Sequence, residues 1–456
     1  MRVSAAVAGR CPVIAIIGGG FCGTLTAVQL LRQAGPGTRI LLIERSGDFG
    51  PGVAYATRDD RHVLNVPAAR MSAFAAEPDD LVEWAGVEPE AYIPRRVYGE
   101  YLRARLARAA ARSAARLERV TGEVVRARPA RGAIELVLAD GGRLACDRTV
   151  LALGSLPSSP VCELPDDERV IRDPWRDLPV GGSTTLVVGA GPTAVDVALS
   201  LCGASPRAHV IAVSRHGRLP FAHRGGLRRP VPAPALPAGP LRLDELEQRI
   251  RSHIARVDAG GGDWRDAIDG LRPLLPDLWR RLPLPDRRRF LGERLRAWEV
   301  RRHRLAPAAA ASVRALRVQG RLTLVAGGVD RIRARRGGIE LRLHDGRSLT
   351  AARVVTCTGA GMAIAATPDP LVRGLLADGH ASADPLGLGL RATPDGALLD
   401  AAGRSDERIW LLGPLRRGEL WESTAVQELR DQAAVVAGGL CGSLAATGPE
   451  PLAVPA

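Results

Sequence analysis

The chain has 456 residues, of which 46% are hydrophobic and 25% are charged. These are the proportions of a globular protein, and they exclude a disordered, collagen-like or coiled-coil chain. At about 150 residues per folding unit, the length predicts about three units, or two units with an insertion.

The chain is strongly basic, with a net charge of +14 from 63 Lys and Arg residues against 49 Asp and Glu residues. No lysine occurs, and the arginines are spread along segments such as Tyr101–Leu117, which we expect to be helical. This spacing indicates solvated helix faces rather than a nucleic-acid-binding arm. The positive charge would instead attract an anionic cofactor or substrate.

Seven cysteines are present, and none of their spacings is typical of a metal site or a redox pair. We therefore expect no disulfide framework, no metal site and no disulfide-reductase chemistry. No apolar run is long enough to span a bilayer. The sequence predicts a cytoplasmic protein with a small-molecule substrate and neither a membrane nor a nucleic-acid partner, and it leaves homo-oligomerisation open.

The first informative segment combines a strand, a glycine turn, a helix and a second strand. Val13–Ile17 is a short β-branched run, Gly18–Gly23 fits G-x-G-x-x-G, Thr24–Gln33 has helical periodicity, and Arg39–Ile43 is a second strand followed by Glu44. The glycines permit a tight turn and close approach of the backbone to a pyrophosphate at the helix N-terminus, and the acid accepts both ribose hydroxyls. The segment predicts a dinucleotide site.

The second segment repeats this pattern with one change. Thr184–Val188 is a strand, Gly189–Ala194 fits G-x-G-x-x-A, and Ala208–Val213 is the next strand. At its end Ser214 and Arg215 replace the acid. A carboxylate would repel a ribose 2′-phosphate, whereas Ser and Arg accept one, so the segment predicts an NADPH site, with NADH as the alternative. Arg215 could also be one more surface arginine.

Two different motifs in one chain indicate an α/β flavoprotein with two Rossmann-like domains. FAD would occupy the first domain and NAD(P)H the second, which is inserted in the first. Thr149–Ser155 and Val354–Gly361 have the pattern of buried strands that connect two such domains. We expect the FAD domain over 1–180 and 331–456 and the NAD(P)H domain over 181–330, with a helical insertion over about 225–310.

Within the insertion we expect helices over Leu241–Arg256, Trp264–Leu271 and Arg287–Arg304. The insertion could be a scaffold or a lid over the substrate pocket, and its position between the NADPH-domain strands favours a lid. Near the C-terminus, Ile409–Gly413 is a strand and a helix reaches Ala437. Ser423 or Thr424 would be its N-cap. Pro414 stands where flavoproteins of this architecture have an Asp after the glycine.

Several stretches resemble the bacterial FAD/NAD(P)-binding proteins, a flavoprotein group related to flavin-containing monooxygenases and N-hydroxylases. The resemblance lies in Gly52–Ser72, Pro94–Leu102, Ser214–His223, Asp263–Pro273, Trp298–Pro307 and Gly413–Arg430. It implies that Asn65, Met71 and Ser72 lie near the flavin, and that His223 and Arg302–Arg304 lie toward the nicotinamide. Alternatively, Asn65 caps a turn and Arg302–Arg304 form a salt-bridged helix end.

Together these arguments predict two sets of cofactor-binding residues and no identifiable catalytic residue. The predicted FAD-binding residues are Gly18, Gly20, Phe21, Cys22, Gly23, Glu44, Arg45, Asn65, Gly154, Gly413, Thr424 and Ala425. The predicted NAD(P)H-binding residues are Gly189, Gly191, Pro192, Thr193, Ala194, Ser214 and Arg215.

The favoured function is an FAD-dependent NAD(P)H oxidoreductase, specifically a monooxygenase that oxygenates a small nucleophile such as an amine. The cofactors carry such chemistry, which explains the lack of a catalytic triad or metal cluster. The alternatives are a flavin-dependent dehydrogenase or reductase that passes electrons to another acceptor, and a non-catalytic FAD/NAD(P)-binding protein.

Overall fold

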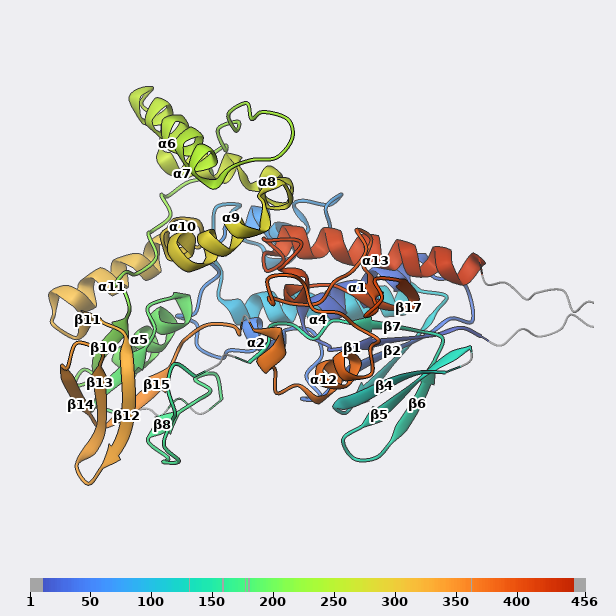
Figure 1. Ribbon diagram of the computed structural model, residues 1–456, viewed down its shortest axis with the longest axis horizontal. Helices are drawn as coiled ribbons and strands as arrows, with labels where there is room; N and C mark the ends of the chain where they lie inside the picture. The colour runs from blue at the N-terminus through green and yellow to red at the C-terminus, as the bar shows by residue number, and fades with distance from the viewer. Residues whose placement is uncertain are drawn as a thin grey trace, which may run out of the picture.

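The computed structural model describes residues 11–446 except 131, 158–159, 177, 179–180 and 362. Two parallel sheets lie side by side, and a group of helices covers the junction between them (Figure 1). The chain therefore has the predicted α/β class with two dinucleotide-binding-type domains.

The first sheet has six strands in the order β16-β17-β7-β1-β2-β3. All neighbours pair in parallel except β16, which is antiparallel to β17. The strands are β1 (Val13–Ile17), β2 (Arg39–Glu44), β3 (Arg116–Thr121), β7 (Arg148–Leu151), β16 (Ala397–Leu399) and β17 (Ser405–Leu411). β1 lies in the centre and is buried throughout, as its unbroken apolar run predicts.

Alternate residues of β1 point into two different apolar cores. Ile14 and Ile16 pack beneath three helices, α1 (Phe21–Gln33), α4 (Arg95–Arg112) and α13 (Val426–Ala446). Ala15 and Ile17 face a small antiparallel sheet and helix α12. The elements on this second face are β4 (Val124–Ala130), β5 (Ala133–Leu138), β6 (Arg143–Cys146) and α12 (Pro370–Ala377).

The second domain repeats this three-layer arrangement. Its sheet has the order β11-β10-β9-β15-β8, all parallel, with helices α5 and α11 on one face and the antiparallel sheet β12-β13-β14 on the other. The elements are β8 (Val170–Ile171), β9 (Thr184–Val188), α5 (Pro192–Ala204), β10 (His209–Ser214), α11 (Pro307–Val318), β11 (Leu322–Ala326), β12 (Val329–Arg335), β13 (Gly338–Leu343), β14 (Ser348–Ala351) and β15 (Arg353–Thr356).

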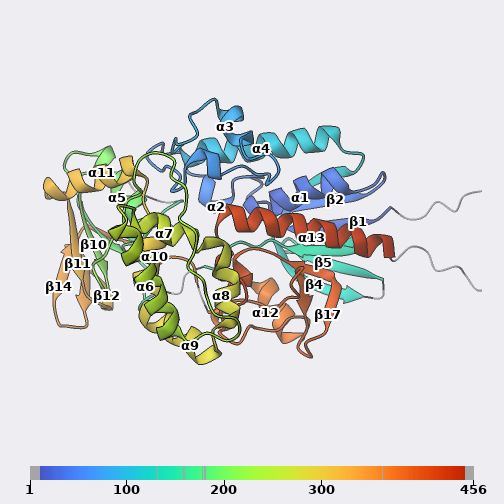
Figure 2. The same ribbon diagram turned by 90° about the horizontal axis from the view of Figure 1, so that it is seen from above.

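Between β10 and α11 the chain leaves the second domain to form a helical insertion, seen above both sheets in Figure 1 and near the centre of Figure 2. Trp279 of this insertion stacks on Trp421 of the C-terminal segment, with ring centroids 4.5 Å apart. The helices are α6 (Leu243–Ala259), α7 (Trp264–Gly270), η2 (Arg272–Leu274), α8 (Leu275–Arg281), α9 (Leu284–Arg289), η3 (Phe290–Arg294) and α10 (Leu295–Arg302). An apolar core therefore fixes the insertion to the FAD-type domain.

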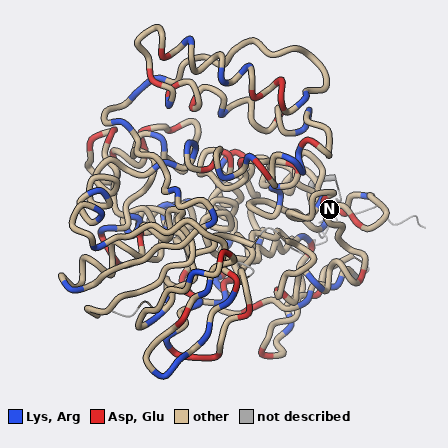
Figure 3. Tube along the Cα trace, turned by 60° about the vertical axis from the view of Figure 1, so that its left-hand side comes forward, with Lys and Arg blue, Asp and Glu red and all other residues tan. Residues whose placement is uncertain are grey.

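The remaining helical elements are short and lie in loops of the first domain. They are α2 (Gly52–Tyr55), η1 (Ala68–Arg70), α3 (Asp80–Ala85), η4 (Ile364–Ala366) and η5 (Pro414–Arg416). Basic and acidic residues are intermingled along the whole described trace (Figure 3). Many of them form ion pairs, such as Arg249 with Glu245 on α6 at 2.8 Å.

Several sequence-based boundaries differ from the structure. By strand pairing, the second domain reaches from β8 to β15, beyond the expected range 181–330. The expected helix Tyr101–Leu117 ends at Arg112, because Arg116 and Leu117 pair with β2 as part of β3. The expected single helix Arg287–Arg304 is divided into α9, η3 and α10.

Among the described residues, no helix is both long and apolar enough to cross a membrane. All seven cysteines are free thiols. The described residues contain no cluster of three or more His, Cys, Asp or Glu side chains suited to a metal ion.

Candidate dinucleotide sites and the pocket beside them

The first glycine loop joins β1 to α1 through a backbone that other residues would disrupt. Gly18 has a φ of +102°, and a Cβ there would lie 2.4 Å from the carbonyl oxygen of Ala152. A Cβ at Gly23 would lie 1.8 Å from the carbonyl oxygen of Gly18. The loop therefore requires glycine at both positions for close packing.

At the end of β2, the Glu44 carboxylate lies against this loop. The Gly19 N–H donates to its Oε2 at 2.8 Å, and the Ser46 hydroxyl donates to its Oε1 at 3.0 Å. Oε1 also accepts the Ser46 N–H at 3.1 Å, so Oε2 is the oxygen that keeps a further lone pair. No side chain caps α1 at Gly20, so the N–H groups of its first turn remain available to an anion. Arg45, which the sequence also predicts to bind FAD, is exposed, and its Nη1 lies 3.7 Å from Glu123 Oε1.

The second loop joins β9 to α5 in the same way. Gly189 has a φ of +133°, and a Cβ there would lie 2.1 Å from the Cys357 carbonyl oxygen. Gly191, the cap residue of α5, faces open space, since a Cβ would meet nothing within 4 Å. No side chain caps this helix either, and Pro192 at its first position donates no N–H. The open space beside uncapped N–H groups fits a pyrophosphate.

The residues after β10 carry the positive charge that the sequence predicts. Arg215 is exposed, and Ser214 folds its hydroxyl back to accept the Gly217 N–H at 3.1 Å. Arg296 of α10 extends from the insertion to the second glycine loop, where it donates to the Ala190 carbonyl at 2.9 Å. Burial lowers the pKa of Arg296, and the charge of Arg215 acts in the same direction. The sequence pattern did not predict this contact, because α10 is remote in sequence from the glycine loop.

The C-terminal helix begins later than the sequence suggested. α13 starts at Val426, and Leu429 N–H donates to the Ala425 carbonyl, so Ala425 rather than Ser423 or Thr424 precedes the first turn. Ser423 instead accepts a hydrogen bond from Gln432 Nε2 at 3.0 Å. The Gly413 N–H donates to Gln432 Oε1 at 3.1 Å. The next residue is Pro414, which stands where an Asp was expected.

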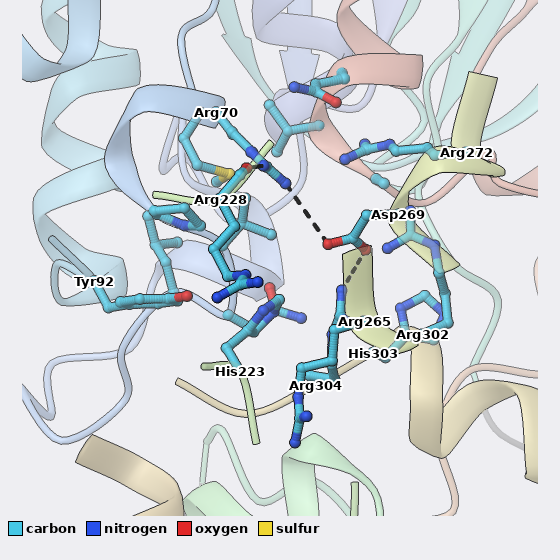
Figure 4. A pocket seen from close by; sticks show the side chains of 18 of the residues that line it. Arg70, Tyr92, His223, Arg228, Arg265, Asp269, Arg272, Arg302, His303 and Arg304 are labelled. Carbon is cyan, nitrogen blue, oxygen red and sulfur yellow. Dashed lines mark hydrogen bonds and ion pairs between the residues drawn. The ribbon is translucent and has the colours of Figure 1, made fainter. Parts of the chain in front are cut away.

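A cavity of about 400 Å³ lies where the first domain, the insertion and the start of α13 meet (Figure 4). Of the residues named by sequence and resemblance, it brings together Asn65, Met71, His223, Arg302, His303, Arg304, Thr424 and Ala425. Ser72 is not among its lining residues, because its buried hydroxyl donates to the Glu77 carbonyl at 2.6 Å. Neither glycine loop lines this cavity, and Gly154, with φ of +72°, also lies outside it.

Most charged groups around the cavity are arginines that the sequence did not single out. The lining arginines are Arg70, Arg95, Arg224, Arg228, Arg265, Arg272, Arg302 and Arg304. Only two lining residues, Asp266 and Asp269, are acidic. Arg302 pairs with buried Glu422 at 3.0 Å and Arg304 pairs with Asp269, as a salt-bridged helix end would, although both arginines also face the cavity.

The two histidines of the cavity are neutral at neutral pH. Burial lowers the pKa of His303 to about 4, and the charge of Arg302 lowers it further. Burial also lowers the pKa of His223 to about 4, with Arg304 acting in the same direction. Neutral imidazoles can each donate one hydrogen bond and accept one without adding positive charge.

The two loops define the class of the molecule, a two-domain fold for binding two dinucleotides. Residues 15–156 match a family model described as FAD-NAD(P)-binding. A comparison with curated protein sequences gives no match.

Solved structures share this architecture over nearly their whole length. The reduced form of the ornithine hydroxylase PvdA from Pseudomonas aeruginosa is 18% identical, with 95% of this chain and 99% of that chain covered and a TM-score of 0.62. The L-lysine 6-monooxygenase from Pseudomonas syringae is 18% identical, with 96% and 99% covered and a TM-score of 0.61. Thioredoxin reductase from T. acidophilum is 10% identical, with 96% and 99% covered and a TM-score of 0.53.

Proposed function

We propose that the chain is an FAD-dependent NAD(P)H oxidoreductase that oxygenates a small nucleophilic substrate such as an amine. The observation that carries the proposal is the pair of equivalent glycine loops with opposite charges beside them. Glu44 stands beside the first and Arg215 beside the second. An acid suits a ribose with free hydroxyls, and an arginine suits a 2′-phosphate.

When bound, FAD accepts a hydride from the nicotinamide and activates dioxygen. The chain positions and shields this chemistry. Glu44 would hold the FAD ribose, the first turns of α1 and α5 would hold the two pyrophosphates, and Ser214 and Arg215 would hold the 2′-phosphate. Asn65, Thr424 and Ala425 line the cavity and would face the flavin.

The charge of the cavity fits oxygenation of an amine nitrogen. An amine reacts as a nucleophile only when it is unprotonated. Nearby positive charges disfavour its ammonium form and so lower its pKa. The arginines that line the cavity would supply this effect, while the neutral His223 and His303 can accept a hydrogen bond from the substrate.

The fold also occurs in disulfide reductases, such as the thioredoxin reductase described above. A thiol reaction is disfavoured here because no cysteine is among the described residues that line the cavity. Burial raises the pKa of both Cys22 and Cys357 to about 12, which leaves no reactive thiolate at either position. Electron transfer to another acceptor is the alternative that remains to be tested.

The proposal is tested by adding NADPH to the FAD-loaded protein without oxygen. We expect the visible flavin absorbance to bleach. With oxygen present, a screen of amines, thiols and ketones is expected to find a compound that increases NADPH consumption without releasing peroxide. Absence of bleaching would favour a non-catalytic binding protein, and substrate turnover that does not need oxygen would favour a reductase.

The Gly20→Asp variant tests whether the first glycine loop holds FAD. A Cβ at Gly20 would lie 3.2 Å from Gly52 Cα, and its carboxylate would repel the pyrophosphate at the helix N-terminus. We expect this variant to purify without FAD while remaining folded by circular dichroism. A yellow Gly20→Asp protein would contradict the assignment of the first loop.

A further inference from the structure

The arginine cavity holds more positive charge than its acidic partners balance. Asp269 on α7 pairs with two cations at once, Arg70 at 3.8 Å and Arg304 (Figure 4). Asp263, at the cap of the same helix, also pairs with two, Arg224 at 3.1 Å and Arg265 at 3.2 Å. Two carboxylates therefore serve four guanidinium groups, and a surplus of positive charge faces the cavity.

The other cavity arginines each have a carboxylate of their own. Arg228 donates to Asp266 at 2.8 Å, and Arg95 pairs with Asp196 at 2.9 Å. Arg272 makes two hydrogen bonds to Glu428. The surplus is thus located around α7, on the side of the cavity that the insertion contributes.

Arg304 is the most deeply buried of these cations, with 1% of its surface exposed. Its Nε and Nη1 atoms are buried and have no hydrogen-bond partner among the described residues. Buried charged donors without a partner are costly, and Arg304 is one of the residues that line the cavity, so an anionic ligand would suit this site.

The phosphates of the two cofactors do not explain this charge. The pyrophosphate sites proposed above lie at the first turns of α1 and α5, and the 2′-phosphate site lies at Ser214 and Arg215. None of these residues lines the cavity. The cavity cations are therefore available to a third molecule.

We propose, on the basis of the function proposed above, that the substrate carries a carboxylate or phosphate group, which Arg70, Arg265 and Arg304 bind. The anionic end would lie toward α7, and the group to be oxygenated would lie toward Asn65 and the start of α13. A substrate with cationic groups at both ends would be rejected by the same arginines, because like charges in a partly desolvated cavity repel strongly.

The test uses three compounds of equal chain length, namely glutarate, 5-aminopentanoate and 1,5-diaminopentane, titrated calorimetrically into the FAD-loaded protein. We expect glutarate and 5-aminopentanoate to bind and 1,5-diaminopentane to show no heat of binding. Equal or tighter binding of the diamine would overturn the proposal. The readout is binding alone, so it does not depend on turnover.

Two variants test the residues. Arg70→Gln and Arg265→Gln are each expected to raise the dissociation constant for glutarate about tenfold, the effect of losing one charge-assisted contact. Arg336→Gln removes the same charge from an exposed turn between β12 and β13 and is expected to change nothing. Equal weakening in all three variants would reduce the effect to net charge and contradict the site. If one cavity variant fails to fold, the other decides.

A titration with saturating NADP⁺ separates substrate anions from cofactor phosphates. We expect glutarate to bind with NADP⁺ present, and Arg70→Gln to leave NADP⁺ affinity unchanged. Competition between the two ligands, together with a tenfold loss of NADP⁺ affinity in Arg70→Gln, would assign the arginines to the cofactor instead. Failure of FAD loading or of flavin bleaching would contradict the proposed function, whereas absence of glutarate binding by a functional flavoprotein would contradict only this inference.

Discussion

The two domains are built on one plan, strand for strand. The order β3-β2-β1-β7 in the first sheet corresponds to β11-β10-β9-β15 in the second, and each has an antiparallel three-stranded sheet on one face. The turns match as well, since Gly18 N–H donates to the Ile43 carbonyl at 2.8 Å and Gly189 N–H donates to the Val213 carbonyl at 2.8 Å. A turn this tight leaves little freedom, so the backbone is the shared part of the two sites.

The side chains around the turns differ. An acid at the end of β2 contacts the first loop, whereas the second loop is contacted by Arg296 from the insertion. Gly20 lies against Gly52, while Gly191 borders open space. The comparison shows that one backbone solution presents two different electrostatic environments, and that these environments, rather than the fold, would distinguish the two cofactors.

The largest expected effect comes from replacing the last glycine of the first motif, Gly23, by the alanine that the second motif has at the equivalent position. In Gly23→Ala the new methyl group would overlap the Gly18 carbonyl at 1.8 Å, so α1 must move away from β1. We expect a loss of about 3 kcal/mol or more in the free energy of unfolding and no FAD in the purified protein. Chemical denaturation and flavin absorbance measure the two effects.

The control exchanges the equivalent residue of the second loop. Ala194→Gly removes a buried methyl group within α5 and is expected to cost about 1 kcal/mol, with FAD retained. Similar losses in both variants would show that the two loops do not differ in how closely the helix packs.

A smaller effect is expected from Arg215→Ala, which tests the difference in charge. Removal of this exposed guanidinium is expected to weaken NADPH binding about tenfold or more and to leave NADH binding nearly unchanged, because only NADPH carries the 2′-phosphate. Dissociation constants for both nucleotides come from fluorescence titration. An equal change for both would remove the proposed role of Arg215.

The parts of the fold that the sequence predicted are those with local signals. β1 and β9 have the predicted bounds, because an apolar run before a glycine turn specifies a central strand. The antiparallel sheets β4-β5-β6 and β12-β13-β14 were not predicted, since strands such as Val329–Arg335 mix exposed arginines with buried Ile332 and carry no motif. Because β12, β13 and β14 lie mostly beyond residue 330, the second domain extends past its expected limit.

The cavity was less predictable than the loops. Asn65 and His223 were reached through a resemblance, but Asp269 and Arg70 were not, because their pairing joins η1 to α7 across 199 positions of the chain. In an arginine-rich sequence a buried arginine has the same local pattern as a solvated one. Arg304 differs from its exposed neighbour Arg301 only through tertiary packing.

The smallest expected effect concerns Arg296, which connects the insertion to the second loop. Its Nη2 donates to the Ala190 carbonyl at 2.9 Å and also to the Arg218 carbonyl. Because these contacts hold backbone rather than a phosphate, Arg296→Gln is expected to weaken NADPH and NADH equally, by about threefold to tenfold. Arg301→Gln is the control and should have no effect, because it changes an exposed arginine of the same helix whose side chain donates to the Ala297 carbonyl of its own turn. A loss confined to NADPH would instead make Arg296 a second phosphate ligand, and the two loops would then differ in how many arginines serve the cofactor as well as in the sign of the charge.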